Sequence, residues 1–248
     1  MNTMVDNDLR FVGESTHPGG HFRDIAVMGR VQVDGDVACR SFSCVGKALV
    51  RGALQSRSTS IMGETRVVGA MDAGECNLMG RMTCEATLRV RKLNCMGQLR
   101  VQGQLDAEKV KLFGELTVQG DCNVDQFSSR GAFAIEGLLS VDNLDVQPYG
   151  PCKAGEIGGA RLEVRRRGGF LGKIPLADWA RKHLFGGTGS SLEAQAIEGD
   201  DVRLEDTTAR IVRGARVHIG RGCRIDVVEY REQYSCAPDS VVGEAKQV

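Results

Sequence analysis

Apolar residues recur in one pattern along the chain between residues 29 and 147. Seven segments of seventeen residues follow one another there, and each has apolar side chains at its third, fifth, ninth, eleventh, fourteenth and sixteenth places. Of the 42 residues at these places, 38 are apolar; the exceptions are Ser56, Thr59, Thr65 and Ser129. Within each pair of places the spacing is two, which is the period of a β-strand with one buried face. The pattern therefore predicts three short strands in each segment.

Glycine stands at fixed places in these segments. The first place is glycine in all seven, and the seventh place is glycine in six, with Ala86 as the exception. Glycine adopts a positive φ at little cost, so we expect these residues to turn the chain with φ above zero. One segment cannot bury its apolar side chains alone, so the segments must stack as successive coils.

The spacing also indicates the type of coil. Strand starts follow steps of six, five and six residues, whereas a left-handed hexapeptide helix has three equal steps. We therefore predict an all-β fold: a single-stranded right-handed parallel β-helix (β-solenoid) with 17-residue, three-strand coils.

Outside the seven segments the pattern is less regular. Leu9 and Phe11 are expected to form a first strand over the N-terminal end, and the loop 17–21 replaces one strand of the first coil. The predicted regions are an N-terminal cap with a first irregular coil (1–28), the regular β-helix (29–164), a loop with a short amphipathic helix (165–190), C-terminal β-helical coils (191–230) and a flexible polar tail (231–248).

Composition narrows the classes of function. The chain has 248 residues with 32 basic and 32 acidic side chains, so its bulk charge does not attract nucleic acid. The sequence contains no run of about 18 apolar residues, so no membrane-spanning helix is predicted. The N-terminus lacks the basic-then-apolar layout of a secretory signal. We expect a cytoplasmic protein without a cofactor.

Several stretches resemble the bactofilins, which are bacterial polymer-forming cytoskeletal proteins. The resemblance covers most of the chain and is carried by the repeats of the form GxLxVxGxLxAxxVxL and by three further stretches: LRFVGESTHPGGHFRDIAVMG (9–29), YGPCKAGEIGGARLEV (149–164) and AIEGDDVRLEDTTARIVRGARVHIGRGCRIDVVEY (196–230). Many bactofilins also have a proline-rich tail and a short N-terminal membrane-targeting segment, neither of which is present in this sequence.

The resemblance implies a non-enzymatic scaffold for cell shape, envelope or appendage assembly. Its coils would join end to end into filaments without nucleotide, with another copy or a paralogous bactofilin as the partner. Unpaired strands at solenoid ends favour such contacts. The candidates for these longitudinal contacts are Leu9, Phe11, Ile25 and Val27 at one end and Ile225, Val227 and Val228 at the other. Terminal segments that cap the ends and restrict growth are the alternative.

The last place of each segment carries a second candidate surface. This place lies beside a corner glycine and is expected to face outward, yet it is apolar in six successive coils. The six residues are Met28, Val45, Met62, Met79, Met96 and Phe113. Either the corner buries them, or they form a lateral apolar stripe that contacts a filament, the inserted helix or a partner.

The insertion at 165–190 suggests two roles. Pro175 suits the first turn of a helix, and basic residues between Arg161 and His183 exceed acidic ones by five. The helix either lies on a membrane surface, giving peripheral contact with the inner face of the membrane, or caps the end of the solenoid. Its apolar side chains are Phe170, Leu171, Ile174, Leu176, Trp179, Leu184 and Phe185.

Histidine and cysteine supply the remaining candidates. Cysteines on inward columns are expected to be buried free thiols, and no CxxC motif suggests a metal site. His17 and His21 flank a Pro-Gly-Gly turn, which does not allow a helical metal-binding pair, so a solvated loop is expected. His218 lies in VHIGRGCRI (217–225), a phrase similar to hexapeptide acyltransferases, where histidine acts as general base. A β-helical acyltransferase is therefore the alternative to the scaffold.

Overall fold

The computed structural model describes residues 8–166 and 191–248, and every regular element in those two ranges is a β-strand. The chain divides into two compact units, Met1–Val124 and Asp125–Val248. In each unit the strands pair in parallel with strands one coil further along the chain. Each unit is therefore a parallel β-solenoid, as the repeats predict.

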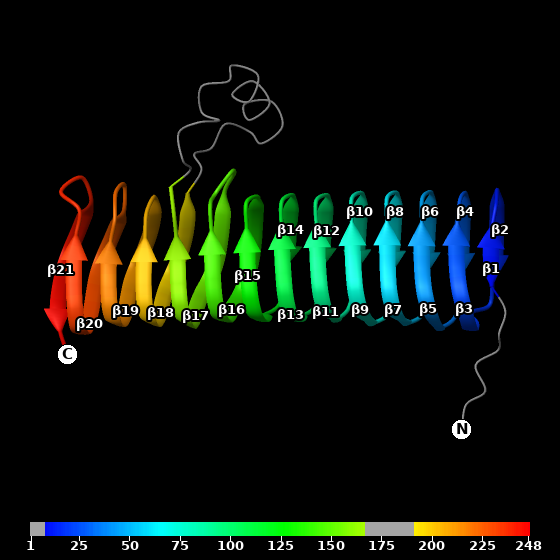
Figure 1. Cartoon of the computed structure of the whole chain (residues 1–248), viewed down its shortest axis with the longest axis horizontal. Helices are drawn as coiled ribbons and strands as arrows, with labels where there is room; N and C mark the ends of the chain where they lie inside the picture. Colours follow the sequence, from blue (N-terminus) through cyan, green and yellow to red (C-terminus); the bar gives the residue numbers. More distant parts are fainter. Residues whose placement is uncertain (1–7, 167–190) are drawn as a thin grey trace, which may run out of the picture. The chain divides into compact units, whose positions relative to one another are not determined.

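The first unit opens with β1 (Leu9–Phe11), β2 (Glu14–His17) and β3 (Gly20–Val27), and then alternates short and long strands (Figure 1). The short strands are β4 (Arg30–Val33), β6 (Lys47–Val50), β8 (Glu64–Val67), β10 (Arg81–Cys84), β12 (Gln98–Val101) and β14 (Glu115–Val118). The long strands are β5 (Val37–Cys44), β7 (Leu54–Ile61), β9 (Met71–Leu78), β11 (Leu88–Cys95) and β13 (Leu105–Leu112), and β15 (Cys122–Ser129) contains the boundary between the units. Equivalent residues pair seventeen apart, for example Leu88 with Leu105.

Each coil of the first unit has the three predicted faces but carries them on two strands. In β7, Leu54 and Ser56 point inward, then Arg57 and Ser58 are both exposed, and the alternation resumes with Thr59 and Ile61 inward. The pairing of β7 with β9 omits Arg57 at the same place. The second and third predicted strands are thus one strand with a bend.

The predicted inward columns form the core of the first unit. Leu54, Leu88 and Leu105 have no exposed surface, and the polar exceptions Ser56, Thr59 and Thr65 are buried with them. The Ser56 and Thr59 hydroxyls lie 2.7 Å apart and share a hydrogen bond. A buried hydroxyl is tolerated where it finds such a partner.

The corner glycines serve a different purpose from the one expected. Positive φ values occur at Gly13, Gly19, Gly20 and Gly222, not at the repeated first-place glycines of the first unit. A Cβ on Gly46, Gly63 or Gly97 would instead lie 1.9 Å from the carbonyl oxygen of the glycine one coil earlier. Glycine is needed because two backbones approach closely, not because the backbone is left-handed.

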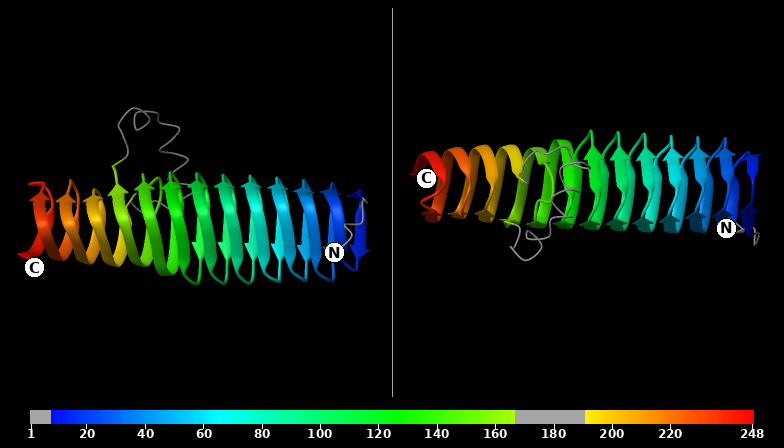
Figure 2. Two further views of the ribbon diagram at one scale, coloured as in Figure 1. Left: turned by 60° about the horizontal axis from the view of Figure 1, so that its bottom comes forward. Right: turned by 90° about the horizontal axis from the view of Figure 1, so that it is seen from above.

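The second unit winds with longer strands, seen from green to red in Figure 2. Its strands are β16 (Ala132–Val146), β17 (Cys152–Val164), β18 (Leu192–Leu204), β19 (Thr207–Ile219), β20 (Arg224–Cys236) and β21 (Val241–Gln247). Paired residues are 18 apart for Leu144 and Leu162 but 15 apart for Leu192 and Thr207, so the coil length varies. The inserted helix proposed for 165–190 lies outside the described residues, apart from its first two positions.

Two regions near the ends of the described residues are more ordered than the sequence pattern predicts. The segment 231–248 is not a free tail, because β20 continues to Cys236 and β21 pairs with β20 from Arg224–Val241 to Tyr230–Gln247. Backbone pairing needs no apolar outer face, so polar side chains do not prevent it. The loop 17–21 is likewise shorter than expected, since β3 starts at Gly20, which pairs with Val37.

Candidate functional site: the assembly surfaces

The N-terminal edge of the first unit consists of β1, β2 and the first half of β3. Among the described residues these segments pair on one side only, with β3, β4 and β5 respectively. The His17 ring lies edge-on to Phe11 at 6.0 Å and to Phe22 at 5.3 Å between centroids. These rings close the interior at this edge, while the backbone groups of the edge strands remain available for pairing.

Two of the four N-terminal contact candidates lie on this edge. Leu9 is half-buried and Phe11 is buried on β1. Ile25 and Val27 do not lie on it, because β3 is paired there on both sides, with β1 and with β5. Their side chains are 3% and 1% exposed. Their assignment to a longitudinal contact was wrong, since β1 covers them.

The C-terminal edge consists of β21 and the second half of β20. Four residues continue the inward columns of β19 and β20 here: Tyr234, Cys236, Val242 and Ala245. They are half-buried or exposed, because no strand among the described residues pairs beyond them. The Tyr234 ring stacks on Tyr230 at 5.2 Å, and burial followed by a hydrogen bond with Cys236 raises the pKa of Tyr234 to about 12.

The three C-terminal contact candidates lie one coil inside this edge. Ile225, Val227 and Val228 each pair with β19 on one side and with β21 on the other. Their assignment to an end contact was also wrong, since β21 covers them. The sequence did contain a signal for the true edge, because Val242 follows Ile225 by the seventeen residues of the repeat.

The last place of each coil in the first unit is exposed. Met62 and Val45 are each 51% exposed, and Met28 is 62% exposed. We call the six residues Met28, Val45, Met62, Met79, Met96 and Phe113 the methionine ladder. Each residue directly precedes a corner glycine, so its side chain leaves the coil where the backbone turns. Of the two predicted alternatives, the structure has the exposed stripe.

The cysteines are mostly buried free thiols. Seven of the nine are buried, Cys39 is half-buried and Cys236 is exposed. Burial raises the pKa of Cys76 to about 12 and that of Cys95 to about 11. Such thiols are poor nucleophiles and poor metal ligands. No group of three or more potential metal ligands gathers in residues 8–166 and 191–248.

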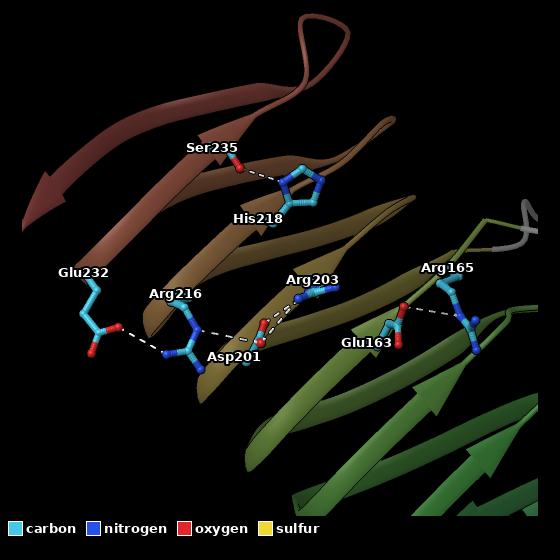
Figure 3. Close-up of polar contacts among 8 residues, drawn as sticks. All are labelled: Glu163, Arg165, Asp201, Arg203, Arg216, His218, Glu232 and Ser235. Atoms are coloured by element: carbon cyan, nitrogen blue, oxygen red, sulfur yellow. Dashed lines mark hydrogen bonds and ion pairs between the residues drawn. The ribbon is translucent and has the colours of Figure 1, made fainter.

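His218 lies on the outer face of β19 in the second unit (Figure 3). Its Nδ1 is 2.6 Å from the Ser235 hydroxyl, and both residues line a shallow hollow of about 300 Å³. Asp201 is the one carboxylate among the residues lining this hollow, and it pairs with Arg203 at 3.2 Å and with Arg216 at 3.8 Å (Figure 3).

This geometry gives His218 a hydroxyl partner rather than a carboxylate. A general base gains from a partner that orients its ring and stabilises the imidazolium, as a carboxylate does. The Arg216 guanidinium pairs with the Glu232 carboxylate, with 3.2 Å between Nη1 and Oε2. His218 is exposed on its strand, and the transferase stays a hypothesis without support from these contacts.

The other candidates are resolved in part. His17 is not a solvated loop residue, because it ends β2, accepts a hydrogen bond from the Gly19 amide at 3.1 Å and contacts two phenylalanine rings. The side chains proposed for a membrane or cap helix, Phe170 to Phe185, lie outside the described residues. The described part of the chain contains no helix able to span a membrane.

Comparison with known proteins finds limited similarity. No family model matches the chain, and no solved structure matches it. The chain is 40% identical over 89 residues to "Uncharacterized protein YhbF" of Bacillus subtilis (strain 168), covering 36% of the chain and 32% of that protein. It is 38% identical over 93 residues to "Uncharacterized protein YhbE" of the same organism, covering 38% of the chain and 35% of that protein. The chain thus spans about a third of the length of these relatives.

Proposed function

We propose that the protein is a non-enzymatic scaffold that self-assembles, without nucleotide, through contacts between the ends of its solenoid coils. The role is the one implied by the resemblance to bactofilins. One observation carries the proposal: the C-terminal edge presents unpaired strand backbone together with inward-column side chains that nothing in the described residues covers.

The composition of this edge favours pairing with another chain. Natural proteins protect free edges with prolines, bulges or inward-pointing charges. In β21 the inward positions are Val242 and Ala245, and the seven residues of the strand include no proline. A second chain that pairs here would extend the hydrogen-bonded ladder and bury both side chains.

The N-terminal edge offers a second surface of the same kind. Its strands β1 and β2 are short, and an ion pair between Arg23 and Asp8 at 2.7 Å lies beside them. The half-buried rings of His17 and Phe22, packed beside the buried Phe11, supply the apolar surface. End-to-end contact therefore needs no cofactor: backbone pairing and apolar burial supply the association.

The test places positive charge at an inward position of the C-terminal edge and compares it with the same charge on the outer face of the same strand. The variant Val242→Lys directs an ammonium group to the open end, whereas the control Val241→Lys places one on the outer face of the same strand. Negative-stain electron microscopy and sedimentation velocity of purified protein, without nucleotide, measure the assembly.

We expect filaments from the wild type and the control, and short particles from the edge variant. Wild-type protein that stays monomeric at high concentration would overturn the proposal. Assembly of the edge variant to the wild-type length would overturn the assigned edge. A discrete trimer would instead favour the transferase alternative.

A further inference from the structure

We propose that the methionine ladder is a lateral interface between two copies of this chain, packed antiparallel about a two-fold axis. This contact runs along the side of the first unit and is separate from the end-to-end contact proposed above. It is argued from the exposure of the ladder, the surface beside it and the order of the neighbouring charges.

The ladder is an apolar column on a surface that is otherwise polar. Its members repeat every seventeen residues, and Met79, Met96 and Phe113 are 52%, 57% and 55% exposed. Successive coils lie about 4.8 Å apart, so the six side chains span roughly 24 Å. An exposed apolar column of this length is a feature that interfaces use. Methionine suits it because its flexible thioether adapts to a facing surface.

The surface beside the ladder has low relief. The corner glycines follow the ladder residues directly and carry no side chains, and short polar residues stand two positions before the ladder in four coils. Those four residues are Ser43, Ser60, Asn77 and Asn94. On this side the ladder therefore projects from its surroundings over those four coils.

A column of polar and charged residues runs parallel to the ladder, two positions after it. Its members are all exposed and read, in chain order, Arg30, Lys47, Glu64, Arg81, Gln98 and Glu115. A two-fold axis perpendicular to the column, lying in the plane of contact, places this column opposite the same column of the second copy, running in the reverse direction.

The order of charges in this column is self-complementary when reversed. With Met62 opposite Met79 of the second copy, Arg30 lies opposite Glu115 and Glu64 opposite Arg81. Lys47 then lies opposite the neutral Gln98. The same register aligns all six rungs of the two ladders.

Neighbouring registers do not have this property. A shift of one coil in one direction places Arg81 opposite Arg81 of the second copy. A shift in the other direction places Lys47 opposite Arg81 and Glu64 opposite itself. A parallel arrangement would instead face the charged column with the serine and asparagine column. The charges therefore select one register, while burial of the ladder supplies affinity.

The expected association is weak for an isolated pair. A standard interface buries about 800 Å² on each partner, and one column of six side chains with its flanks is at the low end of this class. The charged residues also have partners within the chain, such as Lys47 with Glu64 at 2.9 Å. We therefore expect a dissociation constant in the micromolar range, and a larger effect where many copies align.

Cysteine cross-linking tests the direction and the register. The background is Cys236→Ser, which removes the exposed native thiol. Two proteins carry Met62→Cys or Met79→Cys, and a control carries Arg57→Cys on an exposed corner away from the ladder. Each is oxidised alone and as an equimolar mixture at about 100 μM, and disulfide-linked dimers are measured by non-reducing electrophoresis.

We expect the Met62→Cys and Met79→Cys mixture to give at least fivefold more linked dimer than either protein alone or the control. Self-linking of Met62→Cys at the level of the mixture would overturn the proposed register, because a parallel arrangement and the antiparallel register that faces Glu64 with itself both place Met62 opposite Met62. No linking above the control would overturn the lateral contact between copies and leave the ladder to a different partner.

A second variant separates this contact from the end-to-end one. In Met62→Gln/Met79→Gln/Met96→Gln the core is untouched because these side chains are exposed. We expect at least tenfold weaker lateral association with unchanged thermal unfolding and unchanged single filaments. Lateral bundles that persist in this variant would overturn the lateral contact. The presence or absence of single filaments in the edge variant tests the end-to-end contact of the proposed function and does not bear on the ladder.

Discussion

In the first unit the chain turns at corners where a glycine of one coil lies against a carbonyl of the coil before it, whereas strands of 13 residues run through the corners of the second unit. In the first unit β1 and β2 pair sixteen residues ahead, as Leu9 does with Ile25, and from β3 onward the spacing stays at seventeen. The second varies between 15 and 18 for the pairs Leu192–Thr207 and Leu144–Leu162. Close approach also occurs in the second unit, since a Cβ on Gly159 would lie 1.9 Å from the Val141 carbonyl oxygen. What distinguishes the first unit is that such a contact recurs at the first-place glycine of successive coils, together with a nearly constant coil length.

The two units also differ in buried thiols. In the first unit the pKa is raised by burial for Cys39, Cys44, Cys76, Cys84, Cys95 and Cys122. In the second it is raised for Cys152 and Cys223. Small polarisable side chains fill the narrow coils of the first unit, and this makes its stability more dependent on protonation.

The largest expected effect is therefore a loss of stability at alkaline pH, concentrated in the first unit. Buried thiols such as Cys76 and Cys122 titrate near 12 in the folded chain, against an ordinary value of 9.0. Because the folded pKa is raised, the contribution is complete below pH 9 and is lost as pH rises from 9 towards 12. Each fully buried thiol should cost about 1.4 kcal/mol by pH 10.

Urea unfolding followed by circular dichroism between pH 7.5 and 10.5 measures this loss. Replacing Cys76 and Cys95 by valine should reduce the loss of unfolding free energy at high pH by the contribution of these two thiols. Replacing Cys152 and Cys223 in the same way tests the second unit. A stability that stays constant up to pH 10.5 would show that these thiols ionise in the folded state.

The next effect compares a glycine at a close backbone approach with a glycine that has space around it. In Gly97→Ala the new Cβ would lie 1.9 Å from the Gly80 carbonyl oxygen, so two coils must move apart. In Gly158→Ala the nearest atom is the Leu138 Cδ1 at 3.9 Å. We expect the first change to cost about 3 kcal/mol or more and the second less than about 0.5 kcal/mol. Equal urea midpoints for the two variants would contradict the close-approach explanation.

A smaller effect concerns buried hydroxyls. Thr59→Val leaves the Ser56 hydroxyl buried without its 2.7 Å partner and should cost about 1–2 kcal/mol. Adding Ser56→Ala should recover most of that loss, because both polar groups are then gone. In the second unit the Thr207 hydroxyl donates to the Glu205 carbonyl at 2.9 Å, so Thr207→Val has no such rescue. Additive losses at Ser56 and Thr59 would argue against a shared bond.

The smallest effect is at the surface ion pairs. Glu229 accepts from Arg213 at 2.7 Å and lies 3.3 Å from Lys246, which joins β21 to the coil before it. Glu229→Gln should speed amide exchange in β21 about twofold at low salt and have no effect in 1 M salt. Glu64→Gln, which removes the partner of Lys47, is the matched change in the first unit. A loss of β21 protection that persists in salt would indicate a structural role.

The sequence pattern identified the buried columns and the parallel coils because alternation and repetition report directly on burial. It could not assign the reason for the glycines, since a left-handed turn and a close backbone approach both require the same residue. It also left the ladder undecided, because Met62 and its equivalents stand at a corner where alternation gives no rule for burial.

The ends were less predictable for a different reason. Among the described residues β21 pairs on one side only, so its side chains need not alternate between apolar and polar. The charged Glu244 and Lys246 therefore make this strand hard to recognise from the sequence. As a result, candidates chosen by hydrophobicity, such as Ile225 and Val228, lie one coil inside the edge. At the N-terminal edge β1 pairs over Ile25 and Val27 in the same way, so these two candidates also lie one coil inside the edge.

The fixed register of the first unit has a consequence for how such a chain can change its length. Gly46, Gly63 and Gly97 each meet the glycine one coil earlier, so an insertion or deletion of a few residues between two such glycines breaks the contact between them unless the change is accommodated in a loop. Loss or duplication of one whole repeat restores every partner. A gene encoding this unit can therefore grow or shrink in whole repeats. The length of the unit then changes in steps of one coil.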